Sequence, residues 1–207
     1  MPKFVDGVMR FQTHIFPAKK ALFEALSDGQ SPEALFITCS DSRIETGMLT
    51  QSEPGELFVC RNVGNIVPPH TEHTGGVTAS LEFAAAVLKV PHIVICGHTG
   101  CGAMEAAIGT QSLSELPHVR HWLKFTDKAV KIVEQTGQGK SAAEKQDMLT
   151  EQNVILQLEH LKTHPTVAER LKTGALTLHG WVYHITTGDV QVFDTQKDAF
   201  VPTAEYY

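Results

Sequence analysis

The sequence predicts an α/β fold: a mainly parallel central sheet of four strands plus an antiparallel edge strand, helices on both faces, and an N-terminal helical arm. Two observations predict it. Short apolar segments typical of strands covered on both sides alternate with longer segments of helical periodicity. The 207 residues also contain no internal repeat or low-complexity stretch, so we expect residues 1–207 to form a single domain.

The helical arm is predicted at residues 1–27. Within residues 3–16 one helical face collects the apolar side chains Phe4, Val5, Val8, Met9, Phe11, Ile15 and Phe16. Pro17 then opens a second helix that runs to about Leu26. An apolar face at a chain terminus has to be covered, and a partner subunit is a candidate for covering it.

The first half of the domain is predicted to contain three strands and one helix. The first strand, 34–38, is apolar throughout, and the second, 56–60, follows the turn signal Glu-Pro-Gly at 53–55. An alanine-rich helix at roughly 74–88 comes next. The third strand, 92–96, leads directly into a glycine-rich motif.

The second half is predicted to be helical first and extended afterwards. A helix at about 117–136 and a longer one at about 142–162 flank a Gly/Ser break at 137–141. Residues 175–186 are predicted to form the fourth strand, and residues 190–194 the edge strand that follows a turn.

Composition narrows the class of protein. Hydrophobic residues make up 42% and charged residues 19% of the chain, and the net charge is −6, so no basic nucleic-acid footprint is expected. No run of 18 apolar residues predicts a membrane span, and the first residues show no secretory signal. Four cysteines are few for a disulfide scaffold, which favours a reduced, cytoplasmic location.

Three residues form a candidate zinc site: Cys39 directly after the first predicted strand, and His98 and Cys101 directly after the third. In parallel sheets, ligands bind beyond the carboxyl ends of the strands, where both motifs lie. Two thiolates and one imidazole are three zinc ligands, and catalytic zinc sites keep the fourth position for water or substrate. The pattern therefore predicts a zinc enzyme that activates water.

Asp41 and Arg43 follow the first ligand at short spacing. Asp41 can accept a hydrogen bond from a zinc-bound hydroxide and orient it, and Arg43 can keep that carboxylate ionised through a charge-assisted pair. An alternative also fits these residues: Asp41 itself could occupy the fourth zinc position when Arg43 releases it, which would close the site.

Together these motifs resemble those of the β-class carbonic anhydrases over nearly the whole chain. The matching segments are Cys-Ser-Asp-Ser-Arg at 39–43, Glu-Pro-Gly-Glu-Leu-Phe at 53–58, Arg-Asn-Val-Gly-Asn at 61–65, Gly-His-Thr-Gly-Cys-Gly at 97–102 and Gly-Trp-Val-Tyr at 180–183. The resemblance implies reversible hydration of CO2 to bicarbonate and a proton, with one Zn2+ per chain at Cys39, His98 and Cys101. It also implies a homodimer or homotetramer in which the N-terminal helix embraces a neighbouring subunit.

The resemblance implies roles for further residues as well. Asp41 and Arg43 correspond to the family's catalytic pair. The substrate-binding positions are the amide donors Gln30 and Gly102 and the apolar wall residues Phe58, Val63 and Phe83. Phe83 stands where plant-like members of the family carry tyrosine, so one hydroxyl is lost from the pocket.

The resemblance also bears on regulation. The bicarbonate-regulated bacterial group has a tryptophan three positions before the first zinc cysteine, where this chain has Phe36. Arg61 and Tyr183 match other positions of that regulatory pocket, but they also occur without regulation. We expect a constitutively open zinc site.

Two other functions fit the same residues. A zinc-bound hydroxide can also hydrolyse COS or CS2, which are linear and apolar like CO2. A non-catalytic, zinc-stabilised CO2/bicarbonate sensor is the alternative from another class, although such a site has no need of Asp41 and Arg43. If a side chain relays the proton released by CO2 hydration, His70 and His73 are the nearest candidates in the sequence.

Overall fold

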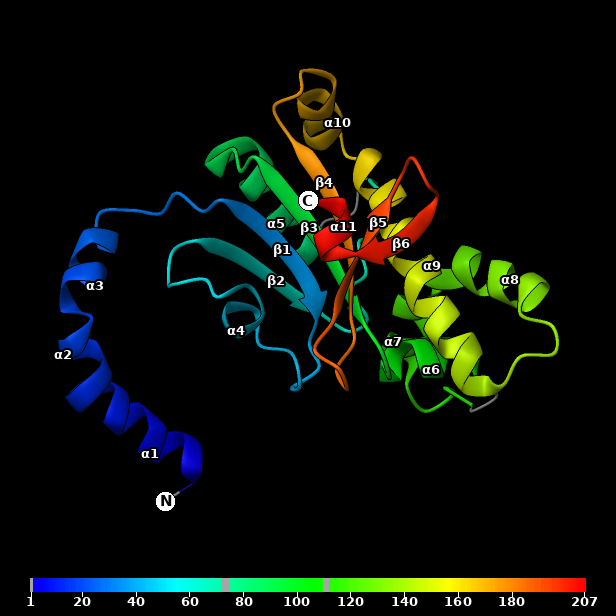
Figure 1. The fold of residues 1–207 in the computed structure, drawn as a ribbon, viewed down its shortest axis with the longest axis horizontal. Coiled ribbons are helices and arrows are strands. Elements are labelled where there is room, and N and C mark those ends of the chain that lie inside the picture. The colour runs from blue at the N-terminus through cyan, green and yellow to red at the C-terminus, as the bar shows by residue number, and fades with distance from the viewer. Residues whose placement is uncertain (1, 72–74, 110–111) are drawn as a thin grey trace. The chain divides into compact units, whose positions relative to one another are not determined.

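The computed structural model describes residues 2–71, 75–109 and 112–207 (Figure 1). The chain divides into two compact units, Met1–Ser31 and Pro32–Tyr207. No helix in the described ranges is long and apolar enough to cross a lipid bilayer.

The N-terminal unit is helical. Its elements are α1 (Lys3–Arg10), a π-helical segment (Phe11–Ile15), α2 (Phe16–Ala18) and α3 (Lys20–Leu26). The predicted break at Pro17 is wrong, because the backbone stays helical through Ala18 and breaks at Lys19. The wide π turn before Pro17 lets the chain continue past a residue that has no backbone N–H to donate. The apolar face of α1 is exposed, with Phe4 at 74% and Val8 at 55%.

The second unit is built on a six-stranded sheet. Its strands are β1 (Ala34–Cys39), β2 (Leu57–Asn62), β3 (His92–His98), β4 (Thr177–Tyr183), β5 (Val190–Asp194) and β6 (Ala199–Pro202). The strand order is β2-β1-β3-β4-β5-β6. The first four strands in this order are parallel and the last two are antiparallel, which confirms the predicted α/β class.

Helices connect and cover the strands. They are α4 (Thr46–Thr50), α5 (Gly76–Glu82) with a π-helical continuation (Phe83–Leu88), α6 (Gly102–Ile108), α7 (Pro117–Leu123), α8 (Asp127–Thr136), α9 (Ala142–Lys162), α10 (Pro165–Lys172) and α11 (Thr203–Tyr206). The alanine-rich helix is predicted to start at about residue 74, which lies outside the described residues.

Both faces of the sheet are covered. On one face Leu35, Ile37 and Ile95 pack against Val154 and Leu158 of α9. On the other face Phe36, Val94 and Cys96 form a smaller cluster with Leu49 of α4. Every residue of β1 is buried, as its continuous apolar sequence predicts.

Three local predictions need correction. The sheet has one strand more than predicted, because β6 pairs with β5 and forms the edge in its place. The predicted single helix at 117–136 is divided by a 3-10 turn, Lys124–Thr126, where the buried Thr126 hydroxyl donates to the Leu123 carbonyl. The predicted strand 175–186 is shorter, since the His184 N–H leaves the sheet and donates to the Asp189 carbonyl in a turn.

The topology explains where a ligand can bind. From β1 the chain crosses to β2 on one side and later to β3 on the other, so β1 and β3 lie side by side with their carboxyl ends at one edge. Such a switch point leaves a crevice beyond the strand ends. Cys39 is the last residue of β1 and His98 is the last residue of β3.

Candidate metal centre

The three predicted zinc ligands come together at this switch point. Cys39 ends β1, His98 ends β3, and Cys101 precedes the first turn of α6. All three are buried, and their ligand atoms lie within 4.8 Å of one another. The two sulfurs are 4.0 Å apart. Tetrahedral zinc with Zn–S bonds near 2.3 Å requires a sulfur–sulfur distance of about 3.8 Å.

His98 shows the clearest sign of a missing ligand partner. Its Nδ1 lies 3.0 Å from the Thr99 carbonyl, to which it donates as an N–H group. Its Nε2 is completely buried and has no hydrogen-bond partner. Burying a ring nitrogen without a partner costs free energy. With the proton on Nδ1, Nε2 has a lone pair that can bind a metal ion. The donor set therefore fits Zn2+.

The two thiols are electrostatically coupled. The hydrogen bond between the sulfurs lowers the pKa of Cys39 and, together with burial, raises the pKa of Cys101. Zinc binding requires both groups as thiolates, because thiolates and not thiols are its ligands.

Asp41 and Arg43 form a bidentate pair beside the ligands. The Arg43 side chain donates to Oδ1 of Asp41 at 2.9 Å and to Oδ2 at 2.7 Å, and its backbone N–H donates to Oδ1 at 2.9 Å. These hydrogen bonds hold the pKa of Asp41 well below its usual range. Oδ2 lies 3.8 Å from Nε2 of His98 and keeps a second lone pair on its other side.

Arg61 holds the loop that carries Asp41. Its guanidinium donates to the carbonyls of Cys39, Asp41 and Ile44 at 2.8–3.1 Å. Arg43 also reaches the Gly100 carbonyl at 2.9 Å, which connects this loop to the one that carries Cys101. Arg43 thus fastens the two motifs to each other, while Arg61 fixes the first one to β2. The sequence places Arg61 in a motif, but its partners are visible only in the structure.

The predicted substrate residues are not gathered at one place within the chain. Phe58 and Phe83 contact each other, with ring centroids 5.9 Å apart. Asn62 of β2 pairs with the zinc ligand Cys39 of β1. Phe58 lies four residues earlier on β2, which is about 13 Å away along the strand. Val63 is 45% exposed, and its carbonyl accepts a hydrogen bond from the Trp122 indole. Gln30 is exposed and belongs to the other compact unit.

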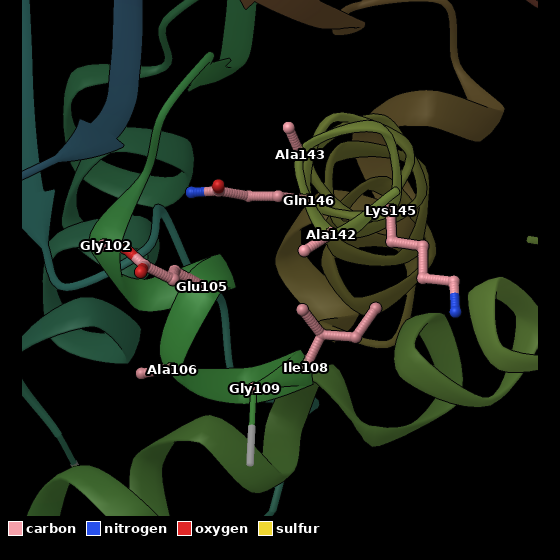
Figure 2. A pocket seen from close by; sticks show the side chains of 9 residues that line it. All are labelled: Gly102, Glu105, Ala106, Ile108, Gly109, Ala142, Ala143, Lys145 and Gln146. Atoms are coloured by element: carbon pink, nitrogen blue, oxygen red, sulfur yellow. The ribbon is translucent and has the colours of Figure 1, made fainter. Parts of the chain in front are cut away.

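Gly102 lies next to the ligand set. It is the first residue of α6, directly after Cys101, and it lines a cavity of about 610 Å³ between α6 and the first turns of α9 (Figure 2). Gln146 extends from α9 across this cavity, and its amide donates to the Cys101 carbonyl at 2.9 Å.

Other candidate residues play different parts. Cys60 and Cys96 are buried free thiols, and burial raises the pKa of Cys96 to about 12, so this thiol stays protonated and packs as a small apolar side chain. The His70 backbone N–H donates to the Thr163 hydroxyl, and its ring contacts that of His164. His73 lies outside the described residues.

A mainly parallel sheet with three zinc ligands at its carboxyl edge and an ionised carboxylate beside them defines a zinc metalloenzyme. Comparison with known proteins identifies the family. Residues 34–190 match the family model described as carbonic anhydrase. The chain belongs to the carbonic anhydrases, and its structural neighbours place it in their β class.

Individual relatives agree over nearly their full length. A carbonic anhydrase of Pseudomonas aeruginosa is 48% identical over 100% of this chain and 93% of the relative. Among solved structures, the β-carbonic anhydrase CcaA superposes with a TM-score of 0.94 at 40% identity, covering 97% of this chain and 98% of that one. Tetrameric β-carbonic anhydrases from Sordaria macrospora superpose at 0.82 and 29% identity, covering 91% and 93%.

Proposed function

We propose that the protein hydrates CO2 reversibly at the centre formed by Cys39, His98 and Cys101, with Asp41 and Arg43 as its catalytic pair. One observation carries this proposal: the ionised Oδ2 of Asp41 lies 3.8 Å from the unpartnered Nε2 of His98. A purely structural zinc site needs no such carboxylate. The same feature argues against a non-catalytic sensor.

Zn2+ held by Cys39, His98 and Cys101 would supply a water molecule of lowered pKa. Asp41 keeps a lone pair of Oδ2 beside the metal position and would accept a hydrogen bond there, which would orient the attacking oxygen toward CO2. Because Arg43 engages both carboxylate oxygens, Asp41 stays ionised and cannot turn away. This arrangement favours a constitutively open site, since a carboxylate held by Arg43 is not free to close it.

A second copy of the chain completes the proposed substrate pocket. Phe58 lies about 13 Å along β2 from the residue paired with Cys39, and Phe83 contacts Phe58 from the helix, so we infer that both reach the centre of a neighbouring subunit. In the described part of the chain β2 is one of the two edge strands of the sheet, and its Val59 is 41% exposed. The Sordaria macrospora enzymes are described as tetrameric, which supports a homodimer or homotetramer here.

The remaining features follow from this assignment. CO2 and bicarbonate are the proposed small-molecule partners, with Gln30 and the Gly102 amide polarising the substrate and Val63 completing the wall. The exposed apolar face of α1 is proposed to pack on a partner subunit. The low cysteine count supports a cytoplasmic location.

Stopped-flow CO2 hydration by zinc-quantified protein, at pH about 7 and about 8.5, tests the proposal. We expect fast hydration at both pH values. Activity only at the higher pH would favour a site closed by Asp41. Absence of hydration by zinc-loaded protein would overturn the proposal, and assays with COS and CS2 would then test the hydrolase alternative.

A further inference from the structure

One stripe of α9 is polar although four of its five residues are buried. Its residues recur at helical spacing: Gln146, Thr150, Asn153, Gln157 and His160. Asn153 and Gln157 are 1% and 0% exposed. Since buried amides in an otherwise apolar interface cost free energy unless every polar atom is paired, their partners are informative.

The partners lie in the segment that follows β2. Nδ2 of Asn153 donates to the Gly64 carbonyl at 3.0 Å, and Nε2 of Gln157 donates to Oδ1 of Asn153 at 2.8 Å. Oε1 of Gln157 in turn accepts from the Val67 N–H at 2.9 Å. The chain of hydrogen bonds therefore runs from Val67 through two side-chain amides to Gly64.

The backbone groups at the two ends of this series of hydrogen bonds decide which side-chain atoms donate and which accept. The Val67 N–H can only donate, so the Gln157 atom facing it is the oxygen and the other is the NH2 group. That NH2 group requires an acceptor on Asn153, which leaves the Asn153 NH2 group facing Gly64. The Gly64 carbonyl can only accept, so both amides have one satisfied orientation.

Gly64 connects this series of hydrogen bonds to the metal centre. Its backbone N–H donates to Sγ of Cys39 at 3.4 Å. Its backbone has a positive φ of +80°, and a Cβ there would lie 3.0 Å from Ala103 Cβ and 3.1 Å from Met104 Cε, so glycine is required. A single residue, Gly64, therefore links the sulfur ligand to the carbonyl that Asn153 holds.

The same helix reaches the other ligand loop. Gln146 donates to the Cys101 carbonyl, and α9 approaches β3 closely at Gly97, the residue before His98. All three ligands are thus adjacent to backbone that one helix face contacts. Partners outside the ligand set commonly orient metal ligands in this way.

We propose that Asn153 is a positioning residue for Cys39: by holding the Gly64 carbonyl it aims the Gly64 N–H at the sulfur and so slows zinc loss. The inference rests on the zinc centre but not on the reaction that the centre catalyses. The hydrogen bonds of the Asn153 side chain go to Gly64 and Gln157, so its effect on Cys39 passes through one backbone residue, Gly64.

The test is zinc release from holoprotein to an excess of a chromophoric chelator, with the folded fraction followed by circular dichroism. Asn153→Leu removes both the donor to Gly64 and the acceptor for Gln157, whereas Asn153→Asp keeps the shape and the acceptor but cannot donate when ionised. We expect both variants to release zinc about tenfold faster than the unaltered chain, and Gln157→Glu to shift the rate in the same direction by less.

Thr126→Val is the matched control, because it also removes one buried hydrogen bond to a backbone carbonyl but lies outside the ligand segments. Cobalt-substituted protein provides a second readout: the sulfur-to-cobalt charge-transfer band should change in the Asn153 variants and not in Thr126→Val. Equal release rates and equal spectra in the folded Asn153 and Thr126 variants would overturn the inference, even if CO2 hydration by the unaltered protein is fast.

Discussion

Oδ2 of Asp41 lies 3.8 Å from Nε2 of His98, and the same oxygen accepts a hydrogen bond from Arg43 at 2.7 Å. The carboxylate is therefore fixed by the arginine on one side and faces the metal position on the other. In the proposed function this geometry would separate two tasks: His98 would hold the metal, and Asp41 would orient what the metal activates.

Asp41→Asn tests the orienting role. The amide keeps the shape but presents an NH2 group or an uncharged oxygen to the nucleophile, and it loses the charge that pairs with Arg43. We expect the rate of CO2 hydration to fall by about 100-fold with zinc content unchanged. A variant that binds a full equivalent of zinc and keeps its rate would contradict the catalytic role.

Arg43→Met tests what keeps Asp41 ionised. Arginine holds the pKa of Asp41 well below its usual range, so the carboxylate of the unaltered protein stays charged at any working pH. Without the guanidinium, the pKa should return upward, and protonation should reduce activity as the pH falls toward about 5. Bicarbonate dehydration between pH about 5 and 7 measures this limb. If activity depends on pH in the same way in Arg43→Met and in the unaltered protein, Arg43 does not act by keeping Asp41 ionised.

Zinc binding should release a proton. The hydrogen bond to Cys39 and burial raise the pKa of Cys101, so we expect this thiol to carry a proton in the metal-free protein. Zinc affinity should therefore increase with pH by about tenfold per unit near neutrality. Calorimetric titrations in buffers of different ionisation enthalpy count the protons. An affinity independent of pH would show that both thiols are already ionised.

Gly97→Ala should disturb the centre through packing. A Cβ on Gly97 would lie 2.8 Å from Val154 Cγ2, so the helix or the strand must move. We expect a loss of about 1–3 kcal/mol in the free energy of unfolding, measured with urea. Adding Val154→Ala should recover part of it, because the smaller side chain makes room.

Gly76→Ala is the control for that substitution. Gly76 is the first residue of α5, and a Cβ there meets nothing within 4 Å. Its unfolding free energy should stay the same or rise slightly. If Gly97→Ala behaves like Gly76→Ala, close contact between α9 and β3 does not constrain position 97.

Buried histidines should make the protein less stable in mild acid. Burial lowers the pKa of His160 and of His164, so in this pH range the unfolded chain binds protons that the folded chain does not. The stability is fully present above about pH 6.5 and decreases as the pH falls from there toward the lower folded pKa values.

His164→Gln provides the measurement. Glutamine can still donate to the Pro68 carbonyl that His164 contacts at 2.9 Å, but it does not titrate. The free energy of unfolding, measured with urea between pH about 7.5 and 5.5, should decrease less steeply in the variant than in the unaltered protein. An unchanged slope would mean that His164 is protonated equally in the folded and unfolded states.

Much of the architecture could be predicted from local patterns. The strand at 34–38 is clear because it is covered on both sides, so every residue in it is apolar or buried. The helix at 142–162 is clear because its buried side chains recur at each turn. The short strand β6 and the helix α10 were missed, because their few residues carry no distinctive period. The π turn before Pro17 was also missed, since a proline indicates a break unless the preceding backbone is known.

The sequence by itself determined the family, the α/β class and the ligand set, because Cys39, His98 and Cys101 stand at strand ends with residue types that bind zinc. The tertiary structure decided how those groups are held. Arg61 reaches the carbonyls of Cys39 and Ile44, and Asn153 reaches Gly64, across distances in the chain that no spacing rule covers. Such contacts depend on the registration of α9 and β2 against the sheet, which is set by the packing of the whole core.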